Sequence, residues 1–439
     1  MAPALAAAFW IAAYLAAVSA PLFVLLAGPT PPGGGFWRDF AMALGFAGLA
    51  MMGVQFFLTA RFKRATAPFG IDLIYYFHRY LALVALAALA AHYVILRLDD
   101  PAQLGSADPR LAPGYMSAGR VALLLFVLLV VASLARRSLR FDYDWWRITH
   151  AFFAIAAVVL ALWHIVGSGR YLSAPWKQAL WLTYGALWIA LVAQVRLLRP
   201  WRIARRPWRI AEVRPERGRV WTLALEPLGH EGLRFQPGQF VWLTARASPY
   251  ALREHPFSLA SSAAGNARLE VSIKELGDFT RSVKDLRPGE KVYLDGPYGA
   301  FSIDRHPAAP GYVFIAGGIG VAPILSMLRT AAERQDRRPL VLFYGNRVWE
   351  RVAFREELER LGGRLALKTV HVLREGPAPA SCESGFVTRE VLDRHLPAER
   401  RPLEYFVCGP TPMTRAVEAS LATLGVPSAR VHSEIFNWV

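Results

Sequence analysis

Residues 1–200 contain long apolar runs separated by short polar connections, whereas the rest of the chain mixes apolar and charged residues every few positions. A helix of roughly 20 apolar residues crosses the hydrocarbon core of a bilayer. Six runs reach that length, at 4–27, 37–60, 71–98, 119–135, 144–167 and 175–197. The first run contains a Val-Ser-Ala sequence typical of signal peptides, but no basic residue precedes it and its apolarity continues, so we count it as a helix. The pattern therefore predicts a membrane bundle of six helices.

Basic residues gather at alternate connections of this predicted bundle, at 61–64, 136–140 and 196–209, while the connection 97–110 carries acidic residues. Lys and Arg in short loops mark the cytoplasmic side of a membrane. We therefore expect an inner-membrane protein with both termini and residues 201–439 in the cytoplasm. The arginines that give the chain its net charge of +17 border apolar runs and form no separate basic domain, so we exclude nucleic acid as a partner.

Four histidines lie in the apolar runs as two pairs with equal spacing, His78 with His92 and His150 with His164. A spacing of 14 positions corresponds to about 21 Å of helix rise and falls about 40° short of four full turns, so both imidazoles of a helix share one face. The two helices are expected to run in the same direction. His78 and His150 then form an inner pair near the cytoplasm, and His92 and His164 form an outer pair near the opposite face.

Two facing imidazoles at each level suit an iron porphyrin, which is an apolar disc with two axial positions. A proton relay or a polar packing contact is the usual interpretation of one membrane histidine, but four with matched spacing make it the weaker one. Zinc is disfavoured because two nitrogen ligands without Cys, Asp or Glu do not complete a tetrahedron. We therefore predict two b-type haems, one at each pair. Arg79 and Arg147 either pair with propionates of the inner haem or snorkel to the membrane interface.

The second half of the chain predicts two further domains. Residues 208–300 contain short β-like runs broken by Pro-Gly pairs, which indicates a small antiparallel barrel. Residues 310–439 alternate apolar strands with helical patterns, which indicates a Rossmann-like α/β domain around a parallel sheet. We place the domains at 1–200, 201–305 and 306–439.

Four short segments of these domains point to nucleotide cofactors. Arg-Glu-His-Pro-Phe-Ser-Leu (253–259) precedes Lys-Glu-Leu-Gly-Asp-Phe-Thr (274–280), and a glycine turn at 317–320 precedes Cys-Gly-Pro (408–410). Glycines between a strand and a helix let a pyrophosphate approach the helix N-terminus, where free N–H groups favour anions. In this order the segments resemble the ferredoxin–NADP reductase superfamily, in the form used by its NADPH oxidase and ferric reductase branch. The membrane half resembles a ferric reductase-type transmembrane domain.

The resemblance implies one site for FAD and one for NADPH. The residues expected at FAD are His255, Pro256, Phe257, Ser258, Lys274, Gly277, Phe279, Thr280 and Phe436. The residues expected at the nicotinamide nucleotide are Gly317, Gly318, Gly320, Pro323, Arg347, Cys408, Gly409, Pro410 and Met413. Phe436 corresponds to an aromatic residue that covers the flavin in relatives, a role that Trp438 takes in the alternative alignment. Arg347 ends a strand where a 2′-phosphate is read, so we favour NADPH over NADH; alternatively, it is a surface arginine paired with Glu356 or Glu357.

The implied function is transmembrane electron transfer. Nicotinamide delivers two electrons as a hydride, haem accepts one at a time, and flavin converts between the two. The resemblance implies a path from FAD through the inner and outer haems to an external acceptor, with no side chain acting as acid or base. We expect dioxygen as the acceptor, giving superoxide, with a ferric chelate as the alternative. A periplasmic partner protein is a further alternative, and a transporter is the weakest because it leaves the dehydrogenase half unexplained.

Overall fold

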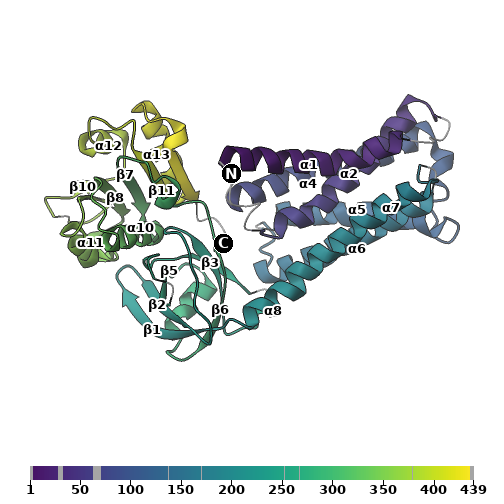
Figure 1. Ribbon diagram of the computed structural model, residues 1–439. Coiled ribbons are helices and arrows are strands. Elements are labelled where there is room, and N and C mark those ends of the chain that lie inside the picture. The colour runs from purple at the N-terminus through teal and green to yellow at the C-terminus, as the bar shows by residue number, and fades with distance from the viewer. Residues whose placement is uncertain are drawn as a thin grey trace. The chain divides into compact units, whose positions relative to one another are not determined.

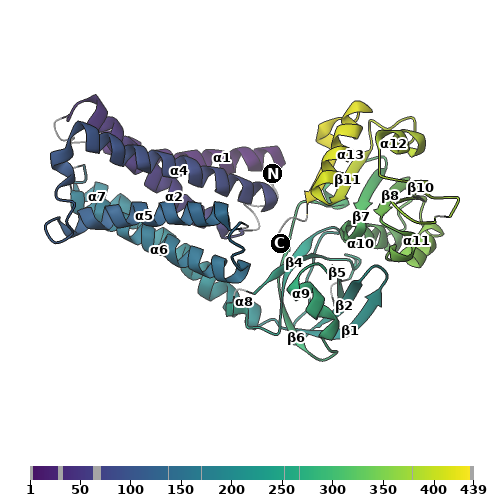
Figure 2. The same cartoon turned by 180° about the vertical axis from the view of Figure 1, so that it is seen from behind.

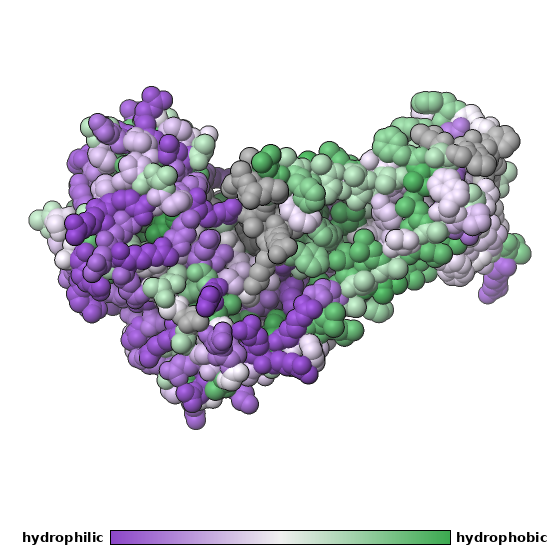
Figure 3. All heavy atoms as spheres, in the orientation of Figure 1, coloured by the Kyte–Doolittle hydropathy of each residue, from purple (hydrophilic) through white to green (hydrophobic). Residues whose placement is uncertain are grey.

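The computed structural model describes residues 3–27, 33–62, 71–136, 138–169, 171–251, 253–265, 267–377 and 379–435. The chain divides into two units, Met1–Pro200 and Trp201–Val439. The first unit is helical, and the second contains both sheets of the structure (Figures 1 and 2). On the face shown in Figure 3, hydrophobic residues dominate the surface of the helical unit, whereas hydrophilic residues dominate that of the second. This contrast is expected if lipid surrounds one unit and water the other.

Among the described residues, six helices are long and apolar enough to cross a membrane, which confirms the predicted bundle. They are α1 (Pro3–Leu26), α2 (Phe36–Thr59), α4 (Ile71–Asp99), α5 (Gly114–Ala135), α6 (Tyr143–Ser168) and α7 (Pro175–Ala193). Helix α7 continues through a π-helical turn (Gln194–Leu198) into α8 (Arg199–Ala204).

Helix α5 begins at Gly114, earlier than the expected start at residue 119. In the structure Arg120 lies inside the helix, and its guanidinium donates to the main-chain carbonyls of Leu104 and Ser106. These hydrogen bonds satisfy the guanidinium locally, so the charge does not end the helix.

The bundle is built from two helix pairs, α2 with α4 and α5 with α6. Glycines allow close packing where bulky rings meet the helices: a Cβ at Gly53 of α2 would lie 1.9 Å from the Trp188 ring of α7. Phe46, Trp181 and Trp188 are buried in the core of the bundle. Small residues at helix contacts are the usual means of tight packing in membranes, where water exclusion gives no driving force.

The barrel of the second unit consists of six antiparallel strands in the order β4-β3-β6-β1-β2-β5. They are β1 (Trp208–Glu216), β2 (Val220–Pro227), β3 (Phe240–Ala245), β4 (His255–Ser258), β5 (Leu269–Lys274) and β6 (Lys291–Tyr298). A bridge between Leu259 and Val271 brings the two edge strands together. The short helix α9 (Asp278–Ser282) follows β5. The predicted antiparallel barrel is therefore present, with the His-Pro-Phe-Ser segment forming its edge strand β4.

The α/β part has a six-stranded parallel sheet in the order β10-β9-β8-β7-β11-β12. Its strands are β7 (Tyr312–Gly317), β8 (Leu340–Asn346), β9 (Leu367–Leu373), β10 (Glu383–Ser384), β11 (Glu404–Gly409) and β12 (Val431–Ile435). Its helices are α10 (Val321–Glu333), α11 (Arg355–Gly362), α12 (Arg389–His395) and α13 (Thr411–Thr423).

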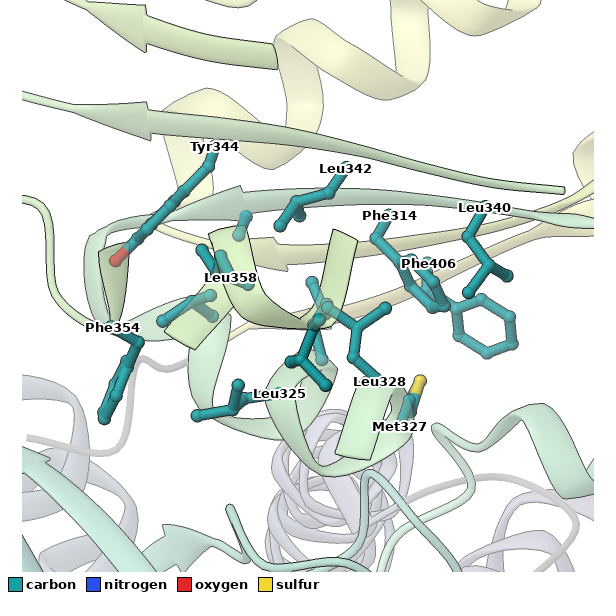
Figure 4. Close-up of a cluster of buried hydrophobic side chains, with 14 of the residues drawn as sticks. Phe314, Leu325, Met327, Leu328, Leu340, Leu342, Tyr344, Phe354, Leu358 and Phe406 are labelled. Atoms are coloured by element: carbon teal, nitrogen blue, oxygen red, sulfur yellow. The ribbon is translucent and has the colours of Figure 1, made fainter. Parts of the chain in front are cut away.

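Alternate residues of the central strand β7 serve the two faces of this sheet. Phe314 and Ala316 belong to the core shared with α10 and α11, whereas Val313 and Ile315 belong to the core shared with α12 and α13. Figure 4 shows the first of these cores, with Phe314, Leu342, Tyr344 and Phe406 of the strands near Leu325, Leu328 and Leu358 of the helices. Buried strands and helices on both faces confirm the predicted Rossmann-like arrangement.

Candidate functional site

The inner histidine pair joins α4 and α6 inside the bundle. The ring centroids of His78 and His150 are 6.4 Å apart, with the ring planes at 72°. Gln55 Oε1 of α2 lies 2.7 Å from His78 Nδ1, and Ser133 Oγ of α5 lies 3.3 Å from His150 Nδ1. Because the Ser133 hydroxyl donates to the Leu129 carbonyl at 2.6 Å, it accepts from the imidazole. Both inner rings are thus held through Nδ1, which leaves Nε2 as the other nitrogen of each ring.

The outer histidine pair is held by main-chain atoms. His92 Nδ1 donates to the carbonyl of Ala41 in α2 at 2.8 Å, and His164 Nδ1 donates to the carbonyl of Tyr115 in α5 at 3.0 Å. The two helix pairs therefore repeat one arrangement, in which the first helix of each pair orients the histidine of the second. Nε2 is again the ring nitrogen that remains.

A glycine faces each outer imidazole one helical turn after the carbonyl that binds it. A Cβ at Gly45 would lie 2.9 Å from His92 Nδ1, and a Cβ at Gly119 would lie 2.7 Å from the His164 ring. Cβ atoms do not approach other atoms this closely, so any larger residue would displace the imidazole. Gly45 and Gly119 therefore create the space in which the outer rings lie.

A cavity of about 300 Å³ lies between the outer histidines, and both His92 and His164 line it. Its walls are mostly apolar, but Arg38 and Arg120 also line it. Arg38 is buried, and its guanidinium lies 3.5 Å from a carboxylate oxygen of Asp100. The guanidinium of Arg120 donates to the carbonyls of Leu104 and Ser106. The cavity thus combines two imidazoles, apolar walls and two guanidinium groups.

These residues fit a b-type haem at each level. Two metal–imidazole bonds of about 2 Å, together with the ring radii, place two ring centroids roughly 6 Å apart. The separation of 6.4 Å in the inner pair agrees with this distance. Histidines that bind metals usually donate their second ring N–H to an oxygen, and all four do so.

The two arginines expected at the inner level have different surroundings. The side chain of Arg79 is exposed on the helical unit, whereas Arg147 is partly buried. At the outer level, Arg38 and Arg120 line the cavity. They were not predicted from the sequence.

The expected flavin segment forms an aromatic stack with a buried hydroxyl beside it. The His255 ring stacks on Phe279 with centroids 3.9 Å apart at 20°, and Phe257 lies 6.0 Å from Phe279 at 22°. Ser258 is 4% exposed, and its Oγ has no hydrogen-bond partner among the described residues. A buried hydroxyl normally has a partner, so a ligand that bonds Ser258 fits this position. Pro256, which lies between His255 and Phe257 in β4, pairs with Trp242 of β3.

The segment 276–280 satisfies its own polar groups at the start of α9. Thr280 Oγ1 accepts from the N–H groups of Leu276 and Gly277, both at 2.8 Å. The Thr280 hydroxyl donates in turn to the Gly277 carbonyl at 3.0 Å. Gly277 and Thr280 were expected at FAD. In the structure these hydrogen bonds fix the turn that positions Phe279.

Lys274, the last residue of β5, lies at the glycine turn of the α/β part. A Cβ at Gly318 would come 3.4 Å from Lys274 Nζ. Burial, and to a lesser degree the charge of Arg351, lowers the pKa of Lys274. The sequence placed Lys274 with the flavin. The structure brings its amine beside the turn expected to bind the nicotinamide nucleotide.

The glycine turn packs directly against the Cys-Gly-Pro turn because β7 and β11 are neighbours. Ala316 pairs with Cys408 in the sheet. A Cβ at Gly320 would lie 2.1 Å from the Cys408 carbonyl, and one at Gly317 would lie 2.6 Å from Met413 Sδ. The same strand register brings Gly318, Pro323, Gly409 and Pro410 to this end of the sheet. The expected nucleotide residues therefore gather at the carboxyl ends of the strands, where α/β sheets bind ligands.

Arg347 lies at the carboxyl end of β8 and forms an ion pair. Its Nε lies 2.7 Å from an oxygen of Glu375, and both side chains are largely exposed. The alternative prediction, an ion pair of Arg347 with Glu356 or Glu357, is therefore wrong. Glu357 instead binds Arg329 at 2.6 Å.

Phe436 and Trp438 lie outside the described residues. The last described residue, Ile435, ends β12 and pairs with Gly409 of β11.

Three protein-family models match the chain. The ferric reductase like transmembrane component matches residues 44–161, the FAD-binding domain matches 222–302, and the oxidoreductase NAD-binding domain matches 314–419. In this order they give the chain the domain architecture of the ferric reductase and NADPH oxidase superfamily. The nucleotide-binding domains are those of NAD(P)H oxidoreductases. The match to a transmembrane component agrees with a multi-pass membrane protein.

Individual proteins resemble part of the chain. The reductase component of propane 2-monooxygenase from Rhodococcus jostii (strain RHA1) is 32% identical over 237 residues, which cover 52% of this chain and 62% of that protein. NADH-cytochrome b5 reductase 1 from Candida albicans is 30% identical over 178 residues, covering 40% of this chain and 60% of that protein. The chain thus spans less than two thirds of these relatives. The structure of flavohemoglobin from Malassezia yamatoensis aligns with a TM-score of 0.50 at 17% identity, covers 91% of this chain and 97% of that one, and shows a likeness of fold alone.

Proposed function

We propose that the chain transfers electrons from cytosolic NADPH, through FAD and two b-type haems, to dioxygen on the outer face of the inner membrane. The product is superoxide. The observation that carries this proposal is the fixing of four histidines at two levels of the bundle, each through Nδ1. The same chain carries domains that belong to NAD(P)H oxidoreductases, so it contains an electron source beside the metal-binding rings.

The cofactors supply the redox chemistry: flavin accepts two electrons as a hydride and releases them singly, and each haem iron carries one. The residues of the barrel position the flavin. We assign Ser258 Oγ as the hydrogen-bond partner of its ring system, because this buried hydroxyl is otherwise unsatisfied. We assign His255, Phe257 and Phe279 as the apolar wall on which aromatic rings of the cofactor pack.

The carboxyl end of the parallel sheet binds the nicotinamide nucleotide. The close packing of Gly317 and Gly320 on the turn of Cys408 leaves no room for side chains there, so that a pyrophosphate reaches the N-terminus of α10. Lys274 Nζ lies beside Gly318 and neutralises phosphate charge there. Arg347 leaves Glu375 for a 2′-phosphate, which favours NADPH as the donor.

The histidines hold iron and exclude direct binding of the acceptor. Hydrogen bonds to oxygen through Nδ1 leave Nε2 of each ring to bind the metal. With two imidazoles as ligands, the iron of a bound haem would have no free position for the acceptor, which would then receive electrons by outer-sphere contact. Arg38 and Arg120 would pair with the propionates of a haem in the outer cavity.

A ferric chelate is the second candidate acceptor. It is supported by the match of residues 44–161 to the ferric reductase like transmembrane component. Outer-sphere transfer needs no open position on the iron for a chelate or for dioxygen, so the same residues serve either reaction. A periplasmic protein is the third candidate, which requires no change in the path of the electrons.

Purified protein reconstituted with FAD and haem tests the proposal. Supplied with NADPH, it is expected to consume oxygen and to reduce cytochrome c in a reaction that superoxide dismutase suppresses. Parallel assays with ferric citrate, and with NADH in place of NADPH, separate the acceptor and donor alternatives. Consumption of NADPH with neither acceptor would favour a protein partner. A preparation without a Soret band after ample haem supply would overturn the haem assignment.

A further inference from the structure

Three metal-binding side chains meet at the edge of the parallel sheet, at the amino-terminal ends of its strands. Glu404 is the first residue of β11, and His432 is the second residue of the edge strand β12. His306 lies in the connection from the barrel to β7. The cofactor residues gather at the other end of the same strands, beyond Gly409. The cluster is therefore separate from the proposed nucleotide site.

One carboxylate oxygen faces both imidazoles. Glu404 Oε2 lies 2.8 Å from His432 Nε2 and 3.8 Å from His306 Nδ1. The two imidazole rings contact each other at a tilt, with centroids 4.1 Å apart and ring planes at 32°. One ligand atom from each residue falls within 4.8 Å of the other two. Ligands of a tetrahedral zinc ion, at bond lengths of about 2.0–2.2 Å, are separated by roughly 3.3–3.5 Å, so shifts of about 1 Å bring the three atoms into range.

The surroundings hold these side chains in place. Phe406 packs on both rings, with centroids 5.0 Å from His432 and 6.0 Å from His306. Arg430 binds Glu404 Oε1 at 2.8 Å and the carbonyl of Pro402 at 2.9 Å. Arg430 thereby fixes the orientation of the carboxylate, while its charge lowers the affinity of the cluster for cations. Oε2 stays directed at the imidazoles.

We propose that His306, Glu404 and His432 form a binding site for a divalent transition-metal ion, with Zn²⁺ as the ion that the donor set favours. Two imidazole nitrogens and one carboxylate oxygen are a ligand set that zinc uses with a water molecule in the fourth position. The histidine side chains are 28% and 22% exposed, which leaves the solvent side open for that water. Carboxylate and imidazole donors without thiolate disfavour Cu⁺, and two nitrogens disfavour Mg²⁺ and Ca²⁺.

The bound ion joins three segments of the α/β part that are distant in sequence. It fastens the edge strand β12 to β11 and both to the connection at His306. An ion that binds the folded state and not the unfolded state raises stability in proportion to the logarithm of its concentration over its dissociation constant. The bound ion therefore stabilises the folded α/β part and takes no part in electron transfer.

A second contact between a histidine and a glutamate provides the matched control. His395 Nε2 lies 2.6 Å from Glu383 Oε1, and Arg394 lies 2.6 Å from the same carboxylate. This pair has a carboxylate, an arginine and one histidine, but the described residues place no second histidine with it. It distinguishes a metal site from an ordinary His–Glu ion pair.

The test uses the full chain in detergent, loaded with FAD and with haem so that the bundle histidines are occupied, and stripped of free metal ions with a chelator. Titration with Co²⁺, followed as a difference spectrum, is expected to give the visible absorption of tetrahedral coordination at one ion per chain, and Zn²⁺ is expected to displace it and raise the unfolding temperature. His306→Ala and His432→Ala should each weaken the binding at least tenfold, whereas His395→Ala should leave it unchanged. Retained FAD absorbance verifies that each variant is folded, and His306→Gln and His432→Gln replace any alanine variant that is not.

Two results would overturn the proposal. One is Co²⁺ binding that survives in the His306→Ala/His432→Ala double variant with unchanged stoichiometry. The other is equal weakening by His395→Ala, which would assign the binding to scattered surface histidines.

Discussion

The inner and outer histidine pairs occupy equivalent positions in the bundle but are held by different chemistry. The outer rings donate to the main-chain carbonyls of Ala41 and Tyr115. The inner rings donate to side chains, the amide of Gln55 and the hydroxyl of Ser133. A carbonyl of the main chain is present whatever residue stands there, whereas a side-chain acceptor depends on its residue. The inner pair is therefore the one whose hydrogen-bond acceptors a single substitution can remove.

This difference matters because the acceptor tunes the metal. A stronger hydrogen bond from Nδ1 makes the imidazole a more basic ligand, which stabilises the oxidised metal and lowers its reduction potential. At the inner level the bond to Gln55 is short, at 2.7 Å, whereas the bond to Ser133 is long, at 3.3 Å. We expect Gln55 to contribute most of the tuning there.

Removing an outer ligand should have the largest effect. His164→Ala deletes one of the two residues proposed to bind the outer haem, so we expect the loss of one haem equivalent and of transfer across the membrane. Reduction of FAD by NADPH should remain, because its residues lie in the other unit. Haem content, measured from the absorption of the pyridine complex, checks the first effect. Two haems per chain with unchanged bis-imidazole spectra would refute the assignment of His164.

Filling the space of the outer pair should have the next largest effect. A Cβ in Gly119→Ala would lie 2.7 Å from the His164 ring and must displace it. Changes at the partners of metal ligands cost about 10–100-fold in metal affinity, and we expect a loss of outer haem in that range. The control is Gly185→Ala, whose Cβ would meet only the Leu162 side chain, at 3.0 Å. Equal haem loss in both variants would point to helix packing as the cause.

Changing the amide of Gln55 should shift a potential without loss of haem. Gln55→Leu removes the acceptor and should raise the potential of the inner haem, whereas Gln55→Glu offers a stronger acceptor and should lower it. A tenfold change in the redox equilibrium is about 59 mV for one electron, which we expect for each variant. Spectroscopic redox titration measures both haems at once. Shifts of the same sign in the two variants would contradict this role.

The free energy of unfolding of the Gln55→Leu variant should differ little from that of the unmodified protein. Gln55 is buried, and its Nε2 has no hydrogen-bond partner among the residues that the structure describes. Leucine removes this unsatisfied donor together with the bond to His78, and the two effects offset each other.

Ser133→Ala should have the smallest effect. The hydrogen bond that it removes is 3.3 Å long, compared with 2.7 Å for Gln55. We expect a shift of the inner potential in the direction of Gln55→Leu but smaller. A larger shift than that of Gln55→Leu would reverse the order of the two acceptors.

In the bundle, the sequence predicted those features that show as a pattern along a single helix. Apolar runs identified the six spans, and a spacing of 14 residues grouped the histidines by face. The oxygens that orient the rings come from α2 and α5, and no periodicity indicates which helices pair. One signal was available: Gly45 and Gly119 lie in apolar runs where glycine is costly, and both lie against a histidine.

In the second unit, motifs identified the segments but not all of their neighbours. The His-Pro-Phe-Ser and glycine segments form the expected strand and turn. Lys274 belongs to a flavin motif by sequence, yet its amine lies at Gly318 because β5 ends beside the glycine turn. The ion pair of Arg347 with Glu375 likewise depends on the contact between two loops at the edge of the sheet. Such contacts between segments distant in sequence require the fold.

The pairing of Ile435 with Gly409 has a practical consequence for handling the protein. Because β12 runs parallel to β11 and ends level with Gly409, a bulky group inserted after Ile435 would stand beside the Cys408 turn. An affinity tag or a fluorescent reporter joined there would crowd the space proposed for the dinucleotide. Reporters therefore belong in a surface loop away from this end of the sheet, and kinetic data from a fusion made at β12 need an unmodified reference.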